Sequence, residues 1–319
     1  MDEWEWIAQL RALTRADPAA RNLMDDAAFL AGREGHELVI STDAMVEGVH
    51  FTSSETPDIV ARRLLRTNLS DLAAKAAEPI GYFLTTAFPP GFGRAEREAF
   101  IRGLAEDGET YQLPLLGGDT TATSGPLVVS ATVLGWSPSE RRIERSGACD
   151  GDLLMVCGTI GDGYLRWRAM RGELADPGGV LARRFQLPEP LLCLRAPLRL
   201  YARAAADVSD GLIADAGHIA EASGCGLIID LDAMPVSPEA TAWLADHPDR
   251  SAGVLELATG GDDYALVCAV SADQAGPLSD SLVEQGVASG IAGRFEAAPG
   301  LRVTRAGQPI AVDKLGWTH

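Results

Sequence analysis

Short clusters of acidic and hydroxyl residues recur along the 319-residue chain. They are Asp25-Asp26, Ser41-Thr42-Asp43, Gly117-Gly118-Asp119, Asp207-Val208-Ser209-Asp210 and Gly261-Asp262-Asp263. Most of them follow an apolar run that is typical of a buried strand, and open α/β sheets bind ligands where strands end. Carboxylates gathered there repel one another unless cations hold them. The pattern therefore favours a site with several Mg²⁺ ions, which prefer hard oxygen ligands.

This donor chemistry predicts phosphoryl transfer, because Mg²⁺ shares its oxygen ligands with substrate phosphates. Asp71 adds to the pattern, since it lies beside the apolar stripe of the helical segment NLSDLAAKAA, where aspartate has a poor helix propensity. Each other aspartate has an alternative role as a turn former, and Asp210 before Gly211 could cap its own helix. The residues alone leave a shared metal site and separate turn-forming aspartates equally open.

Other motifs of enzyme chemistry are few. The chain contains no GxxxxGK[ST], GxSxG or HExxH motif. The glycine-rich segment from Gly158 to Gly163 could cradle a phosphate with backbone N–H groups, although a plain loop is the commoner outcome. His50 and His218 have no partner at metal-ligand spacing and are expected to be hydrogen-bonded structural residues. Arg145 could grip a phosphate.

Composition excludes several classes of protein. Lys and Arg number 27 against 45 Asp and Glu, and a net charge of −18 argues against a nucleic-acid partner. The acidic N-terminus lacks the features of a signal peptide, and no apolar run approaches the ~20 residues that span a bilayer. Five widely spaced cysteines form no disulfide framework. We therefore expect a cytoplasmic protein with no membrane partner.

The hydrophobic pattern predicts a strand–helix alternation in two domains, 1–140 and 141–319, with the boundary in the turn-rich segment 137–152. The first domain should contain strands at 37–43, 81–88, 113–119 and 126–136 and helices at 4–13, 57–77 and 94–108. In the second domain, one strand should begin at 152, another should lead into 206–210, two more should span 226–231 and 264–270, and two strands should close the chain. Helices are expected near 162–171, 190–204, 211–223, 237–246 and 273–286. The fold class is α/β (α+β), with a mixed sheet and helices in the N-terminal domain and an α+β C-terminal domain.

Seven segments in order resemble the thiamine-monophosphate kinase family of the aminoimidazole ribonucleotide synthetase superfamily. They are DDAAFL, ISTDAMVEGVHF, NLSDLAAKAAEP, GGDTT, RSGACDGD, DVSDGLIADAGHIAEASG and GGDDYAL, and the match runs from about residue 25 to the C-terminus. The resemblance implies an N-terminal α/β domain that binds metal and nucleotide and dimerises through its sheet, and a C-terminal α+β domain. It also implies transfer of the γ-phosphoryl group of ATP to thiamine monophosphate by a homodimer.

The resemblance further implies roles for individual residues. The enzyme would bind several Mg²⁺ ions, and ATP would be the co-substrate. A monovalent cation is a further candidate ligand. The metal ligands would be Asp26, Ser41, Thr42, Asp43, Asp71, Asp119, Asp207 and Asp210. The nucleotide would contact Gly118, Asp119, Arg145 and Ser209, and thiamine monophosphate would contact His50, Asp262 and Trp317. Asp71, Asp119 and Asp210 would be catalytic.

The chain departs from the family pattern at two positions. Met24 replaces a usual glycine before the first aspartate pair, and Asp262 replaces the glutamate of a GGED motif. Three alternative functions remain: another ATP-dependent synthetase of the superfamily, a metal-dependent phosphohydrolase, and a cation-binding or nucleotide-sensing module without turnover. The lack of a cysteine before Cys149 or at the C-terminus counts against selenophosphate synthetases and hydrogenase-maturation enzymes.

Overall fold

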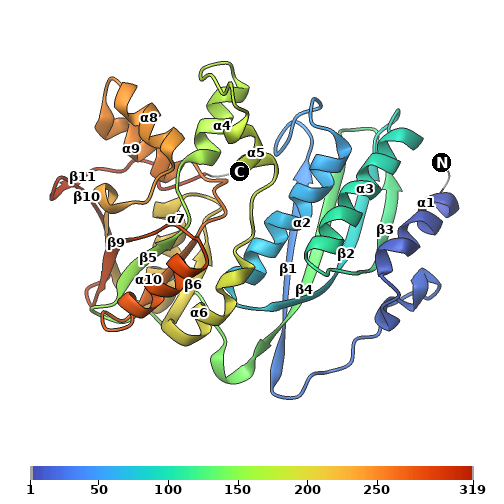
Figure 1. Ribbon diagram of the computed structural model, residues 1–319, viewed down its shortest axis with the longest axis horizontal. Helices are drawn as coiled ribbons and strands as arrows, with labels where there is room; N and C mark the ends of the chain where they lie inside the picture. The colour runs from blue at the N-terminus through green and yellow to red at the C-terminus, as the bar shows by residue number, and fades with distance from the viewer. Residues whose placement is uncertain (1–2, 318–319) are drawn as a thin grey trace. The chain divides into compact units, whose positions relative to one another are not determined.

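The computed structural model describes residues 3–317 and divides into two compact units. Unit 1 comprises Met1–Leu72 and Ala77–Glu140, and unit 2 comprises Ala73–Ala76 and Arg141–His319. Each unit is built around its own mixed β-sheet (Figure 1). Among the described residues, no helix combines the length and the apolar character needed to cross a bilayer.

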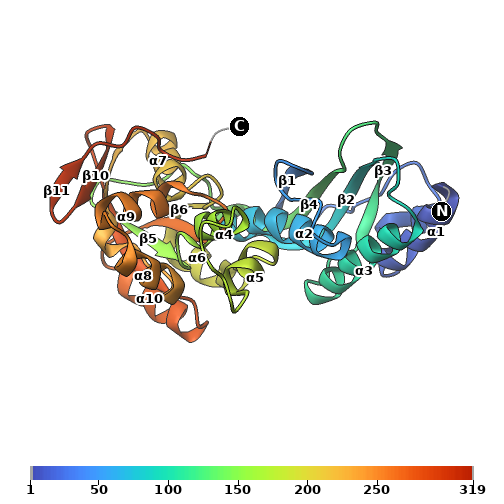
Figure 2. The same cartoon turned by 90° about the horizontal axis from the view of Figure 1, so that it is seen from above.

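Unit 1 has a four-stranded sheet in the order β1-β4-β2-β3, in which β4 is antiparallel to β1 and β2, and β2 is parallel to β3. The strands are β1 (His36–Val46), β2 (Glu78–Phe88), β3 (Leu115–Ala122) and β4 (Val128–Pro138). The helices are α1 (Glu3–Leu10), η1 (Arg11–Thr14), η2 (Pro18–Leu23), α2 (Pro57–Ala74), α3 (Arg94–Thr110) and η3 (Ser139–Arg141). Helices α2 and α3 cover one face of this sheet (Figure 2).

Helix α2 confirms the predicted apolar stripe, because Leu64, Leu65, Leu69 and Leu72 are all fully buried against the sheet. It packs closely on α3 at Gly103, where an added Cβ would lie 2.2 Å from the carbonyl oxygen of Asp58. No side chain can occupy that contact, so the glycine sets the distance between the two helices.

Unit 2 has a seven-stranded sheet in the order β11-β10-β7-β9-β5-β8-β6. The strands are β5 (Leu153–Cys157), β6 (Ala202–Asp207), β7 (Gly226–Asp230), β8 (Leu266–Val270), β9 (Ser289–Glu296), β10 (Gly300–Arg305) and β11 (Gln308–Ile310). The helices are α4 (Asp162–Met170), α5 (Val180–Gln186), η4 (Leu192–Leu194), α6 (Arg195–Tyr201), α7 (Leu212–Ser223), η5 (Leu231–Ala233), α8 (Pro238–Asp246), α9 (Arg250–Thr259) and α10 (Ala275–Glu284).

Both faces of the central strands in unit 2 are buried. On β5, Leu154 and Val156 belong to one core cluster, whereas Met155 and Cys157 belong to another. The first cluster contains residues of α4, α7, α8 and α9, and the second contains residues of α6 and α10. Burial on both faces explains why these strands appear in the sequence as continuous apolar runs.

Some sequence-based boundaries are wrong. The helix predicted over 190–204 ends at Tyr201, because the alanines that follow form strand β6 and pack on both faces of the sheet. Alanine has a high helix propensity, which tertiary burial overrides here. Helices α5 and α9 were not predicted, although Asp249 caps α9 by accepting the backbone N–H groups of Ser251 and Ala252.

We predict that Gly103→Ala lowers the free energy of unfolding by about 3 kcal/mol, because the new methyl group collides with backbone and α2 must move away from α3. Urea unfolding of the full chain measures this change. Gly276→Ala is the control, since Gly276 is a helical glycine with no atom within 4 Å of an added Cβ, and should stay within about 1 kcal/mol of wild type. Equal stability of the two variants would contradict the packing argument.

Candidate active site

Two acidic loops of unit 2 are joined by backbone hydrogen bonds. The loop after β6 and the loop before β8 are connected by Val208 N–H to Ala265 O, Asp262 N–H to Ser209 O and Tyr264 N–H to Val208 O, each 2.8 Å. The structure thus brings together four predicted site residues: Asp207, Ser209, Asp210 and Asp262. The cluster after β6 lies at a strand end, as the sequence predicted. Gly261, Asp262 and Asp263 instead follow helix α9 and precede β8, so the strand predicted before them is wrong.

The C-terminal segment reaches the same loops. Trp317 donates its backbone N–H to the carbonyl of Asp210 at 2.8 Å, and an added Cβ at Gly316 would lie 2.6 Å from that carbonyl oxygen. The Trp317 ring is 44% exposed, and the ammonium of Lys314 lies 5.0 Å from the ring centroid. Trp317 is therefore fixed through its backbone and presents its ring beside Asp210.

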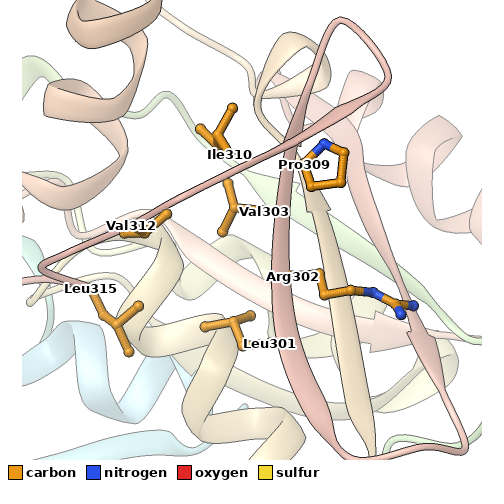
Figure 3. Close-up of a pocket in the computed structure, with 7 residues that line it drawn as sticks. All are labelled: Leu301, Arg302, Val303, Pro309, Ile310, Val312 and Leu315. Atoms are coloured by element: carbon orange, nitrogen blue, oxygen red, sulfur yellow. The ribbon is translucent and has the colours of Figure 1, made fainter.

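An apolar pocket of about 370 Å³ lies between the β10–β11 hairpin and this C-terminal segment (Figure 3). Its lining residues are Leu301, Arg302, Val303, Pro309, Ile310, Val312 and Leu315. Val312 and Leu315 belong to the segment that continues to Trp317. Val312 packs against the core cluster of unit 2, which helps to hold the segment in place.

The loop before β8 has an unusual backbone that bears on Asp262. Gly261, Asp262 and Tyr264 have positive φ angles of 75°, 60° and 51°. Aspartate tolerates this left-handed region better than most side chains, and the Tyr264 hydroxyl donates a hydrogen bond to Asp262 Oδ1 at 3.0 Å. The substitution of aspartate for the family's glutamate therefore fits the local backbone.

The glycine-rich loop before α4 does not present all its backbone donors to a ligand. Asp263 Oδ2 accepts the N–H of Gly161 at 2.8 Å, and Asp263 Oδ1 accepts that of Gly163 at 3.0 Å. Desolvation, with smaller contributions from the charges of Asp162 and Asp262, raises the pKa of Asp263 to about 8 in spite of these two hydrogen bonds. These two amides already have an acceptor, which favours the plain loop over the phosphate cradle.

A second internal carboxylate fills the start of α7. Asp215 Oδ2 accepts the backbone N–H groups of Ser209, Asp210 and Gly211 at 3.0, 3.0 and 3.1 Å. Burial and then the charge of Asp210 raise the pKa of Asp215 to about 6, against the hydrogen bonds from Gly211 and Asp210. Ser209, a predicted nucleotide contact, therefore donates its amide to Asp215, an acceptor that the sequence pattern did not reveal.

In unit 1, Asp43 and Asp71 face each other between β1 and α2. Ser41 Oγ donates to Asp71 Oδ2 at 2.6 Å, and the backbone N–H of Asp43 donates to Asn68 Oδ1 at 3.1 Å. Desolvation, followed by the charge of Asp71, raises the pKa of Asp43 to about 6. Two repelling carboxylates beside a hydroxyl are the hard oxygen donors that suit Mg²⁺, so this set fits the predicted metal.

A predicted metal ligand and a predicted nucleotide contact of unit 1 lie away from this pair. Asp119 and Gly118 are on β3, at the opposite edge of the sheet from β1 and about 14 Å away at the usual strand spacing. Asp43 and Asp119 also lie inside strands rather than after them, so the predicted strand-end positions are wrong for both. Polar residues on exposed edge strands resemble turn residues in a sequence.

Three further residues of unit 1 have local partners. Asp26 lies in an exposed turn, where its N–H donates to Asp25 Oδ1 at 2.8 Å. Thr42 follows Ser41 along the strand, points to the other face, and donates to the carbonyl of Ala131 at 3.1 Å. The ring Nδ1 of His50 accepts the N–H of Val46 at 3.1 Å. None of these contacts joins them to the Asp43–Asp71 pair.

Arg145 lies at the far end of α7 from Ser209. Ser223, the last residue of α7, accepts the N–H groups of Gly147 and Ala148 at 3.1 and 3.0 Å and donates to the carbonyl of Arg145 at 3.5 Å. The 12-residue helix is about 18 Å long, so the backbones of these two predicted nucleotide contacts are well separated. Helix α7 nonetheless anchors both loops.

Comparison with known proteins gives consistent matches over the whole chain. Residues 24–137 and 150–305 match the N-terminal and C-terminal domains described as AIR synthase related protein. The chain is 53% identical to the thiamine-monophosphate kinase of Caulobacter vibrioides over 99% of this chain and 90% of the relative. It is 36% identical to that of Escherichia coli K12 over 92% of this chain and 90% of the relative.

Solved structures agree with these matches. The thiamine-monophosphate kinase of Stenotrophomonas maltophilia has a TM-score of 0.83 and 32% identity, covering 97% of this chain and 98% of its own. A structure described as AaThiL complexed with AMPPCP and TMP has a TM-score of 0.78 and 25% identity, covering 98% and 96%. Escherichia coli HypE, a hydrogenase maturation protein, shares the fold with a TM-score of 0.80 at 22% identity, covering 99% and 98%.

We predict that Mg²⁺ binding weakens about tenfold for each pH unit below about 6, because Asp43 must lose its proton to act as a ligand. The stability of the metal-free protein should change in the opposite direction. Because the pKa of Asp43 is higher in the folded than in the unfolded state, the free energy of unfolding should decrease as the pH rises through about 6. Calorimetric titration with Mg²⁺ at pH 5 to 7.5 measures the affinity. An affinity that stays constant over this range would contradict a role for Asp43.

Proposed function

Because the chain belongs to the thiamine-monophosphate kinase family, we propose that it transfers the γ-phosphoryl group of ATP to thiamine monophosphate, forming thiamine diphosphate and ADP. The observation that carries this proposal is 53% identity to a curated kinase along 99% of the chain. The complex of AaThiL with AMPPCP and TMP supports the same pair of substrates. HypE shares the fold alone and supports no second function.

The proposed reaction needs charge compensation more than a base. The acceptor is an ionised phosphate oxygen, so no strong general base is required, whereas two phosphate groups must approach against their repulsion. Mg²⁺, when bound, would neutralise part of this negative charge. One set of residues that would hold Mg²⁺ is Asp43, Asp71 and Ser41 of unit 1. A second set is Asp207 and Asp210 of unit 2.

Other ligand roles remain proposals taken from the family. Asp26, Thr42 and Asp119 stay predicted metal ligands, and a monovalent cation stays a further candidate. Gly118, Asp119, Arg145 and Ser209 stay predicted nucleotide contacts, and His50 a predicted contact of thiamine monophosphate.

Asp262 and Trp317 are the proposed contacts for the thiamine part of the substrate. The half-exposed Trp317 ring could stack on a pyrimidine or on the cationic thiazolium ring. Asp262 is oriented by Tyr264 and lies in the loop that is hydrogen-bonded to Ser209. Both residues are thus held next to Asp210, the proposed metal ligand.

The five cysteines are free thiols, which supports a cytoplasmic location for the enzyme, where thiols stay reduced. ATP is also supplied there. We propose no membrane or nucleic-acid partner for the enzyme.

We predict that the purified protein with ATP and Mg²⁺ converts thiamine monophosphate into thiamine diphosphate, and that Asp71→Asn and Asp210→Asn each lower kcat at least about 100-fold through loss of a metal ligand. Chromatography of the products measures both. Asp246→Asn, on the exposed end of α8, is the control and should retain wild-type turnover. Release of inorganic phosphate without thiamine diphosphate would indicate a hydrolase instead, and full activity of both variants would remove the proposed metal site.

We further propose that two copies of the chain associate through the sheet of unit 1. Helices α2 and α3 cover only one face of that sheet (Figure 2). On the other face of the edge strand β1, Leu38 and Ile40 are 38% and 58% exposed. Ala19, Ala20 and Ala28 cover part of this face near Leu116 and Leu134. Large apolar side chains that stay exposed on a sheet face are typical of an interface.

The dimer proposal is tested with Ile40→Lys, which places a charge in the proposed interface. We predict a mass of one chain for the variant and of two chains for the wild type, measured by light scattering after size exclusion. Val283→Lys is the control, since Val283 is 72% exposed on α10 and its change should leave the dimer intact. A monomeric wild-type protein at micromolar concentration would overturn the proposal.

A further inference from the structure

We propose that Asp215 is a positioning residue for the reaction: its buried carboxylate fixes the backbone of Ser209, Asp210 and Gly211 and thereby sets where the Asp210 side chain and the Trp317 ring are presented. This inference rests on the proposed kinase function for its kinetic consequence. Its structural part concerns the loop alone and can be measured without substrate.

The geometry is that of an internal anion in a backbone cradle. Three successive N–H groups, from Ser209 to Gly211, converge on the single atom Asp215 Oδ2 at 3.0 to 3.1 Å, and Asp215 is 1% exposed. The backbone N–H of Asp215 returns a hydrogen bond of 3.0 Å to the carbonyl of Gly211. An ionised acceptor strengthens each of these bonds relative to a neutral one.

The carbonyl groups of the same loop bind the other parts of the site. The carbonyls of Val208 and Ser209 accept the N–H groups of Tyr264 and Asp262, and the carbonyl of Asp210 accepts that of Trp317. Since each peptide unit is planar, fixing its N–H fixes the direction of the carbonyl on the same unit. The carboxylate of Asp215 is therefore linked to the substrate loop and to the C-terminal segment through peptide groups.

The loop has little room to adjust if Asp215 is lost. An added Cβ at Gly211, which has a φ of 130°, would lie 3.0 Å from the carbonyl carbon of Thr259, and one at Gly261 would lie 2.5 Å from the carbonyl oxygen of Ser209. Backbone therefore packs against backbone on this side. A rearranged loop would displace Asp262 as well as Asp210, and displacements near 1 Å at a reacting centre cost about 100-fold in rate.

A plain helix cap is the competing explanation, and Asp176 supplies a matched control. Its carboxylate accepts the N–H groups of Leu181 and Ala182 at 3.4 and 2.9 Å at the start of α5. Asp176 and Asp215 thus perform the same hydrogen-bonding task at two helices of unit 2. Only Asp215 binds amides of the loop that carries Asp210.

The test compares Asp215→Ala, Asp215→Asn and Asp176→Ala in the full chain. Amide hydrogen exchange without substrate should rise at least about tenfold at residues 209–211 in Asp215→Ala and remain at the wild-type rate there in Asp176→Ala. Kinetically, Asp215→Ala should lower kcat about 100-fold, Asp215→Asn should lie between it and wild type, and Asp176→Ala should keep kcat. Formate, which can enter the vacated cradle, should restore part of kcat in Asp215→Ala alone.

Each outcome decides the question. Wild-type exchange at 209–211 in a folded Asp215→Ala protein, or an unchanged kcat, overturns the inference. A decrease in thermal stability equal to that of Asp176→Ala with unchanged kcat would assign Asp215 a capping role only. If the alanine variant does not fold, the exchange and kcat of Asp215→Asn give the same decision. If the wild type forms no thiamine diphosphate, the proposed function fails, while the exchange experiment still tests the positioning of the loop.

Discussion

When carboxylates lie close together away from water, their negative charge must be stabilised by cations or hydrogen-bond donors. This electrostatic constraint applies in both units. In unit 1, Asp43 and Asp71 face each other, and Ser41 donates its hydroxyl to Asp71. Burial, followed by the charge of Asp71, raises the pKa of Asp43 to about 6. A raised carboxyl pKa means that the protein stabilises the negative charge less well than water does. A divalent cation supplies that stabilisation most directly, which is the physical reason to connect this pair with Mg²⁺.

Unit 2 meets the same constraint with backbone amides. Asp215 takes three N–H groups at the start of α7, and Asp263 takes two around the start of α4. Helix starts of this kind commonly bind phosphate, because their amides and the helix dipole attract anions. Here internal carboxyl groups occupy these amides and build the loops instead. A phosphate bound in unit 2 would therefore need other donors. The proposed metal ligands Asp207 and Asp210 extend from a backbone that the internal carboxyl groups hold by hydrogen bonds.

The sequence predicted those features that depend on local pattern. The apolar stripe of α2 and the mixed sheets were predicted because periodicity and strand-length apolar runs are local signals. The strand-end positions of Asp43 and Asp119 were wrong, because a polar residue on an exposed edge strand resembles a turn residue. The roles of Asp215 and Asp263 could not be predicted in this way, since their partners are defined by hydrogen bonds that form only when α7, α4 and the loop before β8 are packed.

The replacement of glutamate by Asp262 shows how backbone and chemistry limit each other at this site. Asp262 has a φ of 60°, a left-handed conformation that causes steric strain in most residues with a side chain. Aspartate is among the residues that tolerate it best. The neighbouring Tyr264 is left-handed too, and its hydroxyl holds Asp262 Oδ1 at 3.0 Å. The loop keeps this strained path because Gly261 packs against the carbonyl of Ser209 and the N–H of Asp262 donates to it. The Asp262 carboxylate therefore has a well-defined direction. Compared with glutamate, aspartate reaches one methylene less far but tolerates the left-handed backbone at this position with less strain.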